Sequence, residues 1–226
     1  FTAEMEDVRI ALGQGDYSVP PAGYQAGEYS VIADPETTEL HQGFVQYKNE
    51  GLTIKGGRQI IALDGHRFVG HVGWRQDWQT FDGVTAKYTS GNMSAFYGYV
   101  TQRNRIFAEA ADLDSKDHLL NLSYSSDIGK FTAYAYLLEV DNGVDNGLDT
   151  YGISYAGSTA TDSVKWIYNA EYATQTSDTP AASYDADYYM LEGGAVVSGI
   201  TAKVTYEVLG SDNGMYGFST PLATLH

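Results

Sequence analysis

Basic side chains are concentrated in one stretch of an otherwise acidic sequence. Eight of the 13 lysines and arginines fall between residues 48 and 105, although the formal charge of the chain is −16. They are Lys48, Lys55, Arg58, Arg67, Arg75, Lys87, Arg103 and Arg105. Arginine presents a planar fork that can hold a carboxylate through two parallel hydrogen bonds. This stretch therefore indicates binding of an anionic solute, with Arg58, Arg67, Arg75, Lys87, Arg103 and Arg105 as the contacting or pore-lining residues.

Acidic residues in the same stretch offer these cations a second role. Asp64, Asp77, Asp82 and Glu109 lie near the arginines in sequence and could brace loops by pairing with them. Bracing and solute binding are compatible, because a pore wall can use some charges to hold its loops and others to attract ions. The residues themselves leave both roles open.

Other patterns with chemical potential are weaker. Residues 141–149, Asp-Asn-Gly-Val-Asp-Asn-Gly-Leu-Asp, look superficially like a calcium loop but lack the twelve-residue ligand pattern and its closing glutamate. Repeated Asn-Gly is also ordinary turn chemistry. The five histidines, at 41, 66, 71, 118 and 226, show no metal-ligand spacing. We find neither a nucleophile elbow nor a phosphate loop, and we expect no metal, no cofactor and no catalytic residue.

Composition narrows the class of protein further. A net charge of −16 opposes nucleic-acid binding, because phosphate is repelled. The chain has no cysteine, which excludes disulfides and thiolate chemistry. No run of about 18 apolar residues is present to form a transmembrane helix, and no signal peptide precedes Phe1. We interpret the sequence as a mature or truncated chain.

The dominant hydrophobic period is two, which indicates β-strands. Residues 201–208 alternate Thr, Lys, Thr and Glu with Ala, Val, Tyr and Val, and residues 164–172 place Trp166, Tyr168 and Tyr172 on one face. The pattern predicts eleven strands, near 1–10, 39–48, 52–61, 82–89, 93–102, 117–124, 130–140, 149–157, 163–173, 183–193 and 200–209.

The connections between these strands alternate between short and long. Turns are expected at 49–51, 90–92, 125–129, 158–162 and 197–199, and longer segments at 11–38, 62–81, 103–116, 141–148, 174–182 and 210–226. Outer-membrane barrels sort their connections in this way, whereas sandwiches have no reason to do so. We therefore expect an all-β, antiparallel up-and-down transmembrane β-barrel. Residues 1–226 would form part of one barrel domain, a fragment of about 11 strands that lacks strands at both ends, because single-chain barrels have even strand numbers.

Alternation also predicts which way the basic side chains point. Lys87 lies opposite Val84, Ala86 and Tyr88, so it should face the lumen. Arg58 is harder to place, because strict alternation from Leu52 puts it on the lipid face, where a mid-membrane arginine costs about 2–4 kcal/mol. Either Arg58 lies near the rim, or a bulge at 56–57 reverses the phase of the strand. We favour the bulge.

Several blocks resemble the alginate-export-type porin family of proteobacterial outer membranes. They are Gly-Arg-Gln at 57–59, Leu-Asp-Gly-His-Arg-Phe-Val-Gly at 63–70, Gly-Trp-Arg-Gln-Asp at 73–77, Gln-Thr-Phe-Asp at 79–82, Arg-Asn-Arg-Ile-Phe at 103–107, Tyr-Leu-Leu-Glu at 136–139, and 207–212 with 218–226. The resemblance covers most of the chain. It implies a longer, monomeric barrel of about 16–18 strands, of which this chain would be a large fragment.

Together these observations predict an outer-membrane channel for the passive passage of small or oligomeric, anionic, alginate-like solutes. Its partners would be outer-membrane lipid, lipopolysaccharide and anionic saccharides or other small solutes, with no nucleic acid. Two alternatives stay open: a soluble carbohydrate-binding β domain, which would need no detergent, and a barrel enzyme.

Overall fold

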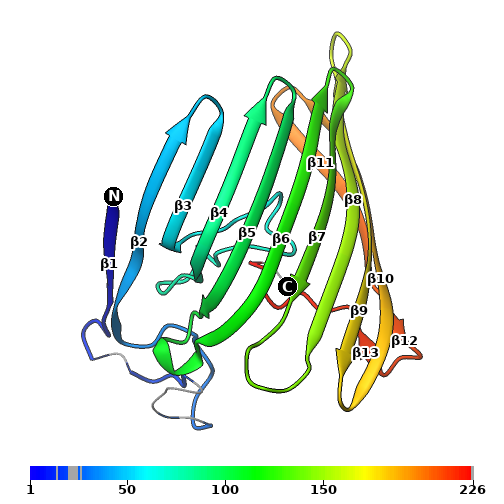
Figure 1. Cartoon of the computed structure of the whole chain (residues 1–226). Coiled ribbons are helices and arrows are strands. Elements are labelled where there is room, and N and C mark those ends of the chain that lie inside the picture. Colours follow the sequence, from blue (N-terminus) through cyan, green and yellow to red (C-terminus); the bar gives the residue numbers. More distant parts are fainter. Residues whose placement is uncertain (14, 20–24, 26, 225–226) are drawn as a thin grey trace.

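The chain forms one long antiparallel sheet in which each strand pairs with the next along the sequence (Figure 1). The computed structural model describes residues 1–13, 15–19, 25 and 27–224. The strands of this sheet are β1 (Thr2–Val8), β2 (Thr37–Asn49), β3 (Leu52–Gln59), β4 (Thr80–Ser90), β5 (Met93–Asn104), β6 (Leu113–Ser126), β7 (Gly129–Leu138), β8 (Gly147–Ala160), β9 (Lys165–Thr179), β10 (Ala182–Val197) and β11 (Ile200–Leu209). This order confirms the up-and-down arrangement and its eleven strands.

Two smaller elements complete the described part of the chain. A 3₁₀ turn, η1 (Glu109–Ala111), lies between β5 and β6, and a small hairpin of β12 (Ser211–Asp212) and β13 (Tyr216–Gly217) follows β11. None of the described helices is long and apolar enough to cross a membrane.

The connections are short at one end of the sheet and mostly long at the other (Figure 1). The expectation of a long segment at 174–182 was wrong, because Thr179 pairs with Ala182 across a tight turn. The Thr179 hydroxyl accepts the Ala182 N–H at 3.1 Å and donates to the Ala182 carbonyl at 2.9 Å. Polar residues 174–178 resemble a loop in composition, but they continue β9 in register with β8 and β10.

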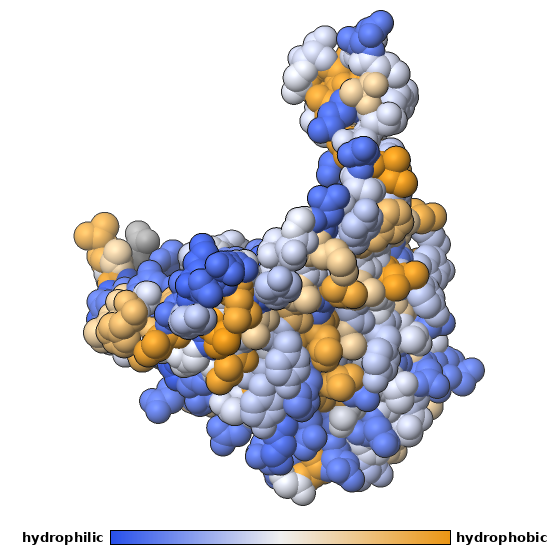
Figure 2. Space-filling view, turned by 45° about the horizontal axis from the view of Figure 1, so that its top comes forward, coloured by the Kyte–Doolittle hydropathy of each residue, from blue (hydrophilic) through white to orange (hydrophobic). Residues whose placement is uncertain are grey.

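The outward face of the sheet is apolar and exposed. Val204 is 78% exposed and Ile153 is 62% exposed, and neighbouring strands add Leu191, Tyr172 and Tyr206. Apolar side chains form patches across the surface seen in Figure 2, among hydrophilic ones. An apolar surface this extensive is unusual for a soluble monomer, but it is the surface a membrane strand presents to lipid.

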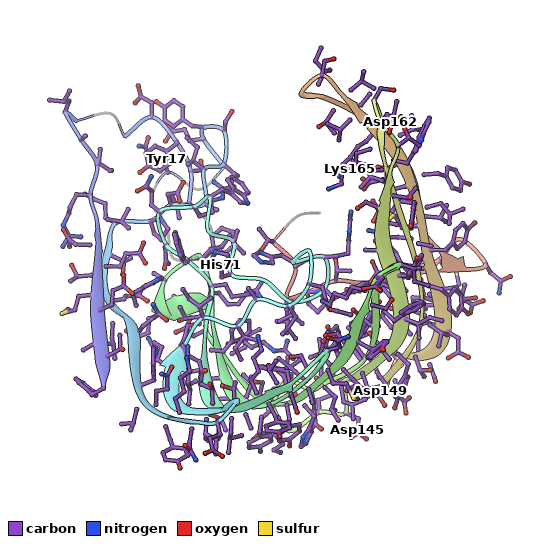
Figure 3. The ribbon with its side chains drawn as sticks, turned by 90° about the horizontal axis from the view of Figure 1, so that it is seen from above. Tyr17, His71, Asp145, Asp149, Asp162 and Lys165 are labelled. Carbon is purple, nitrogen blue, oxygen red and sulfur yellow. The ribbon has the colours of Figure 1, made fainter. Side chains whose placement is uncertain are left out.

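The core lies on the other, concave face of the sheet, beneath two inserted segments. Figure 3 shows the curved sheet from one end, with loop ribbons and His71 inside the curve. We call residues 60–79, between β3 and β4, the inner loop, and residues 218–224 the inner tail. Phe68 and Val69 of the inner loop and Phe218 and Leu222 of the inner tail are buried against wall residues such as Leu119, Tyr134 and Tyr188.

This two-faced arrangement predicts where labels will meet lipid. Spin labels at Val204 and Ile153 of the full-length protein should be reached by a lipid-soluble relaxation agent, because these side chains lie on the outward face. Labels at their chain neighbours Thr205 and Ser154 should be reached by a water-soluble agent instead, because successive side chains alternate between faces. Equal accessibility of all four labels to both agents would contradict the assignment of faces.

Candidate functional site: the concave wall and its inner loop

Three lysines gather on the concave face near the short-turn end. The register pairs Lys48 with Thr53 and Thr53 with Lys87, while Lys55 pairs with Thr85 in the next row. Lys87 therefore lies on the side expected from alternation. Lys55 and Lys87 line a hollow of about 170 Å³, and none of the described residues around it is acidic. The Lys55 ammonium also lies 4.4 Å from the centre of the Phe44 ring.

The inner loop and the inner tail hold each other on this wall. Val69 and Leu222 form a parallel bridge, and the Gly70 N–H donates to the Leu222 carbonyl at 2.8 Å. The Thr224 N–H donates to the His66 carbonyl at 3.0 Å. The buried Gln79 amide donates to the carbonyls of Gly70 and Leu222 at 2.8 and 3.2 Å. The two segments therefore form one body that narrows the space inside the curve.

The two arginines at the end of β5 are buried rather than open to solute. Arg103 pairs with Asp117 on β6, with Nε–Oδ2 at 2.8 Å and Nη2–Oδ1 at 2.6 Å, and both side chains are nearly inaccessible. Arg105 donates to the Gln79 side chain and, at 2.9 Å, to the Pro221 carbonyl. Burial lowers the pKa of Arg105, as does the charge of Arg103. Arg103 therefore joins two strands of the wall, and Arg105 joins the wall to the inner loop and the inner tail.

The remaining arginines also contact carboxylates. Arg67 of the inner loop lies 2.6 Å from Glu207 on β11, and Arg75 lies 3.4 Å from Asp34 in the β1–β2 connection. These pairs tie the inner loop to β11 and to the β1–β2 connection, so both arginines act as braces.

Arg58 does not lie where the sequence predicted. The bulge expected at 56–57 was wrong, because the register of β3 runs without a shift from Leu52 to Arg58 against β2 and from Leu52 to Gln59 against β4. Arg58 therefore lies on the same face of β3 as Ile54. This is the outward face, so Arg58 does not line the pore. It is close to the long-connection end of β3, where Asp82 accepts two hydrogen bonds from it, at 2.8 and 3.1 Å. The carboxylate offsets the cost of the charge at this position.

The other expected bracing carboxylates have different partners. Asp64 pairs with Lys130 on β7 at 2.8 Å and accepts the Asn121 amide at 2.6 Å. Asp77 accepts the Ala108 N–H at 3.1 Å and is nearly inaccessible. Burial, helped by the negative charge of Glu39, raises the pKa of Asp77 to about 7. Glu109 begins η1, in its first turn.

A second cavity, of about 340 Å³, lies between the inner loop and the wall. Its charged lining residues are Asp64, Arg67, Lys130 and Glu171, with Tyr136 among the polar ones. Glu171 accepts a hydrogen bond from the Tyr134 hydroxyl at 2.9 Å. The charges here are mixed, in contrast to the lysine-lined hollow beside β3 and β4.

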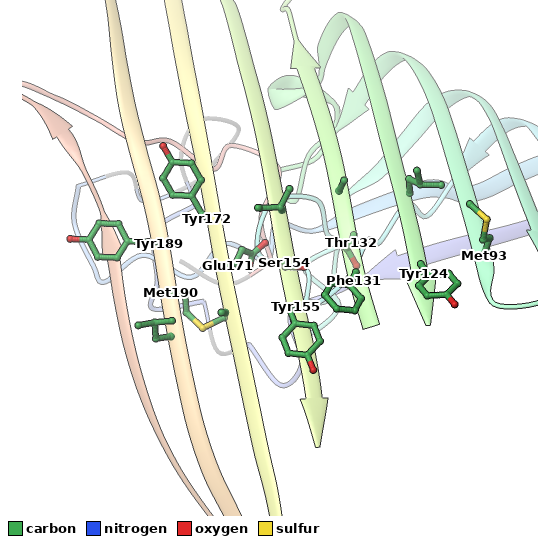
Figure 4. Close-up of a pocket in the computed structure, with 15 residues that line it drawn as sticks. Met93, Tyr124, Phe131, Thr132, Ser154, Tyr155, Glu171, Tyr172, Tyr189 and Met190 are labelled. Atoms are coloured by element: carbon green, nitrogen blue, oxygen red, sulfur yellow. The ribbon is translucent and has the colours of Figure 1, made fainter. Parts of the chain in front are cut away.

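A larger apolar hollow, of about 710 Å³, lies mainly on the outward face. Figure 4 shows the side chains of Tyr124, Phe131, Tyr155, Tyr172 and Tyr189, which come from neighbouring strands, around it. Small residues such as Ala133 and Ala170 leave it shallow and open. We assign it to the lipid-facing surface, because it lacks the convergent polar groups of a solute site.

The geometry gives no cation site at 141–149. The Asn146 amide donates to the Val140 carbonyl at 2.9 Å, and its oxygen accepts the Val140 N–H at 2.7 Å, so this side chain closes the loop. Across the part of the chain that the structure describes, no three His, Asp or Glu residues are grouped to hold a metal. His226, one of the five histidines considered, lies outside the described residues.

Sequence reasoning missed several charged residues of the concave wall, notably Lys130, Glu171 and Glu207. Each lies opposite an apolar outward neighbour, such as Tyr172 beside Glu171 and Tyr206 beside Glu207. A charged residue on the polar side of a membrane strand was therefore the signal that could have identified them.

Comparisons with known proteins agree with this geometry. A model of the alginate export family matches residues 3–218. Among solved structures, Acinetobacter baumannii OccAB4 superposes with a TM-score of 0.64 at 15% identity, covering 76% of this chain and 46% of that one. A. baumannii OccAB3 gives 0.65 at 12%, covering 81% and 51%, and Pseudomonas aeruginosa OccK1 (OpdK) gives 0.60 at 10%, covering 73% and 46%. A search of curated sequences gave no match. The chain spans about half the length of these solved structures.

Proposed function

The chain belongs to the alginate export family, which places it in the Gram-negative outer membrane, and we propose that it forms part of the wall of a passive channel there. The single observation that carries this proposal is the contrast between the two faces of one continuous sheet. The outward face exposes apolar side chains, and the concave face gathers charges, hydroxyls and an inserted loop. A sheet of this kind separates lipid from a polar lumen.

The complete channel requires the sheet to close. The edge strands β1 and β11 each pair with one neighbour in the sheet. Unpaired backbone groups at membrane depth cost several kcal/mol each, so spanning sheets are closed barrels. We therefore propose that further strands complete a monomeric barrel in the full-length protein, and that lipid and lipopolysaccharide surround it.

We further propose that the lumen favours anionic solutes, such as an acidic saccharide. The support comes from lysines rather than arginines. Lys48, Lys55 and Lys87 share the concave face of β2–β4, and among the described residues none of the three forms an ion pair. The arginines discussed above contact carboxylates or backbone carbonyls instead. Selectivity follows charges along the lumen, not the net charge of the protein.

Neutralising these lysines should reduce anion preference. In planar bilayers under a salt gradient, the K48Q/K55Q/K87Q variant of the full-length channel should have a reversal potential shifted toward cation preference. A charge about 4 Å from a passing ion contributes about 1 kcal/mol even in water, or about fivefold in local concentration. We therefore expect the anion-to-cation permeability ratio to fall about fivefold or more.

The control is K116Q. Lys116 is exposed, pairs with Asp141, and lies on the face of the sheet opposite to Lys48, Lys55 and Lys87. Its reversal potential should match that of the wild type. Cation preference in the wild-type channel, or an unchanged ratio in the triple variant, would refute the anionic preference and leave the channel itself standing. The absence of any conductance would refute the channel.

A further inference from the structure

Carboxyl groups from three parts of the chain converge on the end of the inner loop. Asp77 is 4% exposed and lies beside Trp78, whose backbone N–H bonds to the Glu6 carboxyl on β1. Glu39 on β2 and Asp112 after η1 are close enough for their charges to act on Asp77. Asp77, at the end of the inner loop, thus lies among three acids from other elements, Glu6, Glu39 and Asp112. We call these four residues the acid group.

Few cations balance these acids. His41 on β2 lies 2.8 Å from Glu6. The charges of Arg58 and Arg105 act on Asp112, but Asp82 holds Arg58 in two hydrogen bonds, and Arg105 donates to the Gln79 side chain and the Pro221 carbonyl. Asp112 accepts the Arg105 N–H at 2.7 Å, and Asp77 accepts the Ala108 N–H. Burial, together with the negative charge of Glu39, raises the pKa of Asp77 to about 7 and that of Asp112 to about 6. Seating the loop therefore favours protonated acids.

His71, in the middle of the inner loop, has the opposite preference. Its ring packs against Trp78, with ring centroids 4.9 Å apart, and against His66 at 5.0 Å. Its Nδ1 is buried without a hydrogen-bond partner among the described residues. Burial lowers the pKa of His71, and the positive charges that His66 and His41 carry when protonated lower it further. Seating the loop favours the neutral ring.

We propose that the inner loop is a proton-controlled constriction, seated more firmly on the concave wall when the acid group takes up protons and released when it loses them. The proposal rests on the channel function above, because a constriction matters only in a channel. It adds a regulator, the proton, and a moving part, residues 60–79.

The direction follows from linkage. An acid whose pKa is raised in the seated state stabilises that state fully below its ordinary pKa, and the benefit is lost as pH rises through the raised value. For Asp77 this window runs from about 4 to about 7. His71 acts oppositely, because a lowered pKa makes seating lose stability as pH falls below about 6.5. Asp77 is buried and the charges of Glu39 and Asp112 oppose its ionisation, so we expect its effect to exceed that of His71 and seating to strengthen on acidification.

Loop mobility can be measured without reference to conductance. The chain has no cysteine, so G65C in the inner loop gives a unique site for a spin label, and the space around Gly65 is open. In the full-length protein in lipid bilayers, the mobile fraction of this label should rise several-fold between pH 5 and pH 8. A label at N92C, in the β4–β5 turn, should not respond.

Substitutions then separate the contributions. D77N keeps an oxygen to accept the Ala108 N–H but cannot ionise, so most of the pH-dependent rise in the mobile fraction of the residue-65 label should be lost. D112N should reduce it less, and H71N should steepen it. D162N, in the distant β8–β9 turn, is the matched control and should respond as the wild type does. An unchanged response in D77N would overturn the proposal.

Conductance distinguishes failure of the switch from failure of the channel. Single-channel conductance, or open probability, should be lower at pH 5 than at pH 8 in the wild type and nearly independent of pH in D77N. If the channel conducts but neither the label nor the conductance depends on pH, the switch is refuted and the channel stands. If the label responds and no conductance is found, the switch stands as a structural property and the channel is refuted.

Discussion

Replacing Asp117 with asparagine is expected to lower the free energy of unfolding by about 3–5 kcal/mol. The substitution leaves the Arg103 guanidinium buried without its counter-charge, while both side chains are almost completely inaccessible. It also weakens the acceptor for the Glu139 N–H, which bonds to Asp117 at 3.0 Å. Refolding of the full-length protein in detergent across a urea series would measure the change.

A neighbouring pair supplies the control. Lys116 precedes Asp117 on β6 and pairs with Asp141 at 2.9 Å, but both of these side chains are about half exposed. D141N should therefore cost less than about 1 kcal/mol. An R103M/D117L variant should recover most of the loss, because removing both charges leaves no buried ion. Equal effects of D117N and D141N would contradict the view that Arg103–Asp117 braces the wall.

The strands were predictable because membrane strands obey a simple alternation. Residues 200–209 and 82–89 show it clearly, and the structure has strands at both places. The least regular expected strands were near 130–140 and 183–193, where apolar residues occupy both faces. The structure gives the reason: Tyr134 and Tyr188 point into the core beneath the inner loop, so the concave face is dry at these points.

The partners of the charged residues were not predictable from sequence proximity. Arg105 bonds to the Pro221 carbonyl 116 residues away, and Gln79 bonds to the Leu222 carbonyl 143 residues away. Arg58 was assigned to the lumen through a bulge because a lipid-facing arginine is costly. Its carboxylate partner on the next strand, Asp82, removes the need for that bulge. Cross-strand register, which sequence alone fixes poorly, decides such cases.

Phe68 anchors the inner loop through aromatic packing. Its ring centroid lies 5.2 Å from that of Tyr188, 5.3 Å from Tyr134 and 5.8 Å from Phe218, so it joins the loop to two wall strands and to the inner tail. Removing a buried phenylalanine typically costs about 3–5 kcal/mol, through lost burial and the cavity left behind. The strands keep their own hydrogen-bonded ladders, so this loss should fall mainly on the seating of the loop.

We therefore expect F68A to shift the equilibrium between seated and released inner loop by roughly 10²–10⁴-fold, since each 1.36 kcal/mol corresponds to a factor of ten. The full-length F68A channel should show a higher single-channel conductance and faster hydrogen exchange within residues 60–79, while exchange in β7 stays slow. W74A is the matched control, because Trp74 is an aromatic residue of the same loop but is 61% exposed. It should change both readouts little, although its indole N–H donates to the Thr224 carbonyl at 3.3 Å.

An F218A/F68A pair tests the mechanism. Both rings belong to one cluster, so the double variant should lose less free energy of loop seating than the sum of the losses in the two single variants. Unchanged conductance in F68A, with exchange in the inner loop accelerated as expected, would show that the seated loop does not narrow the channel.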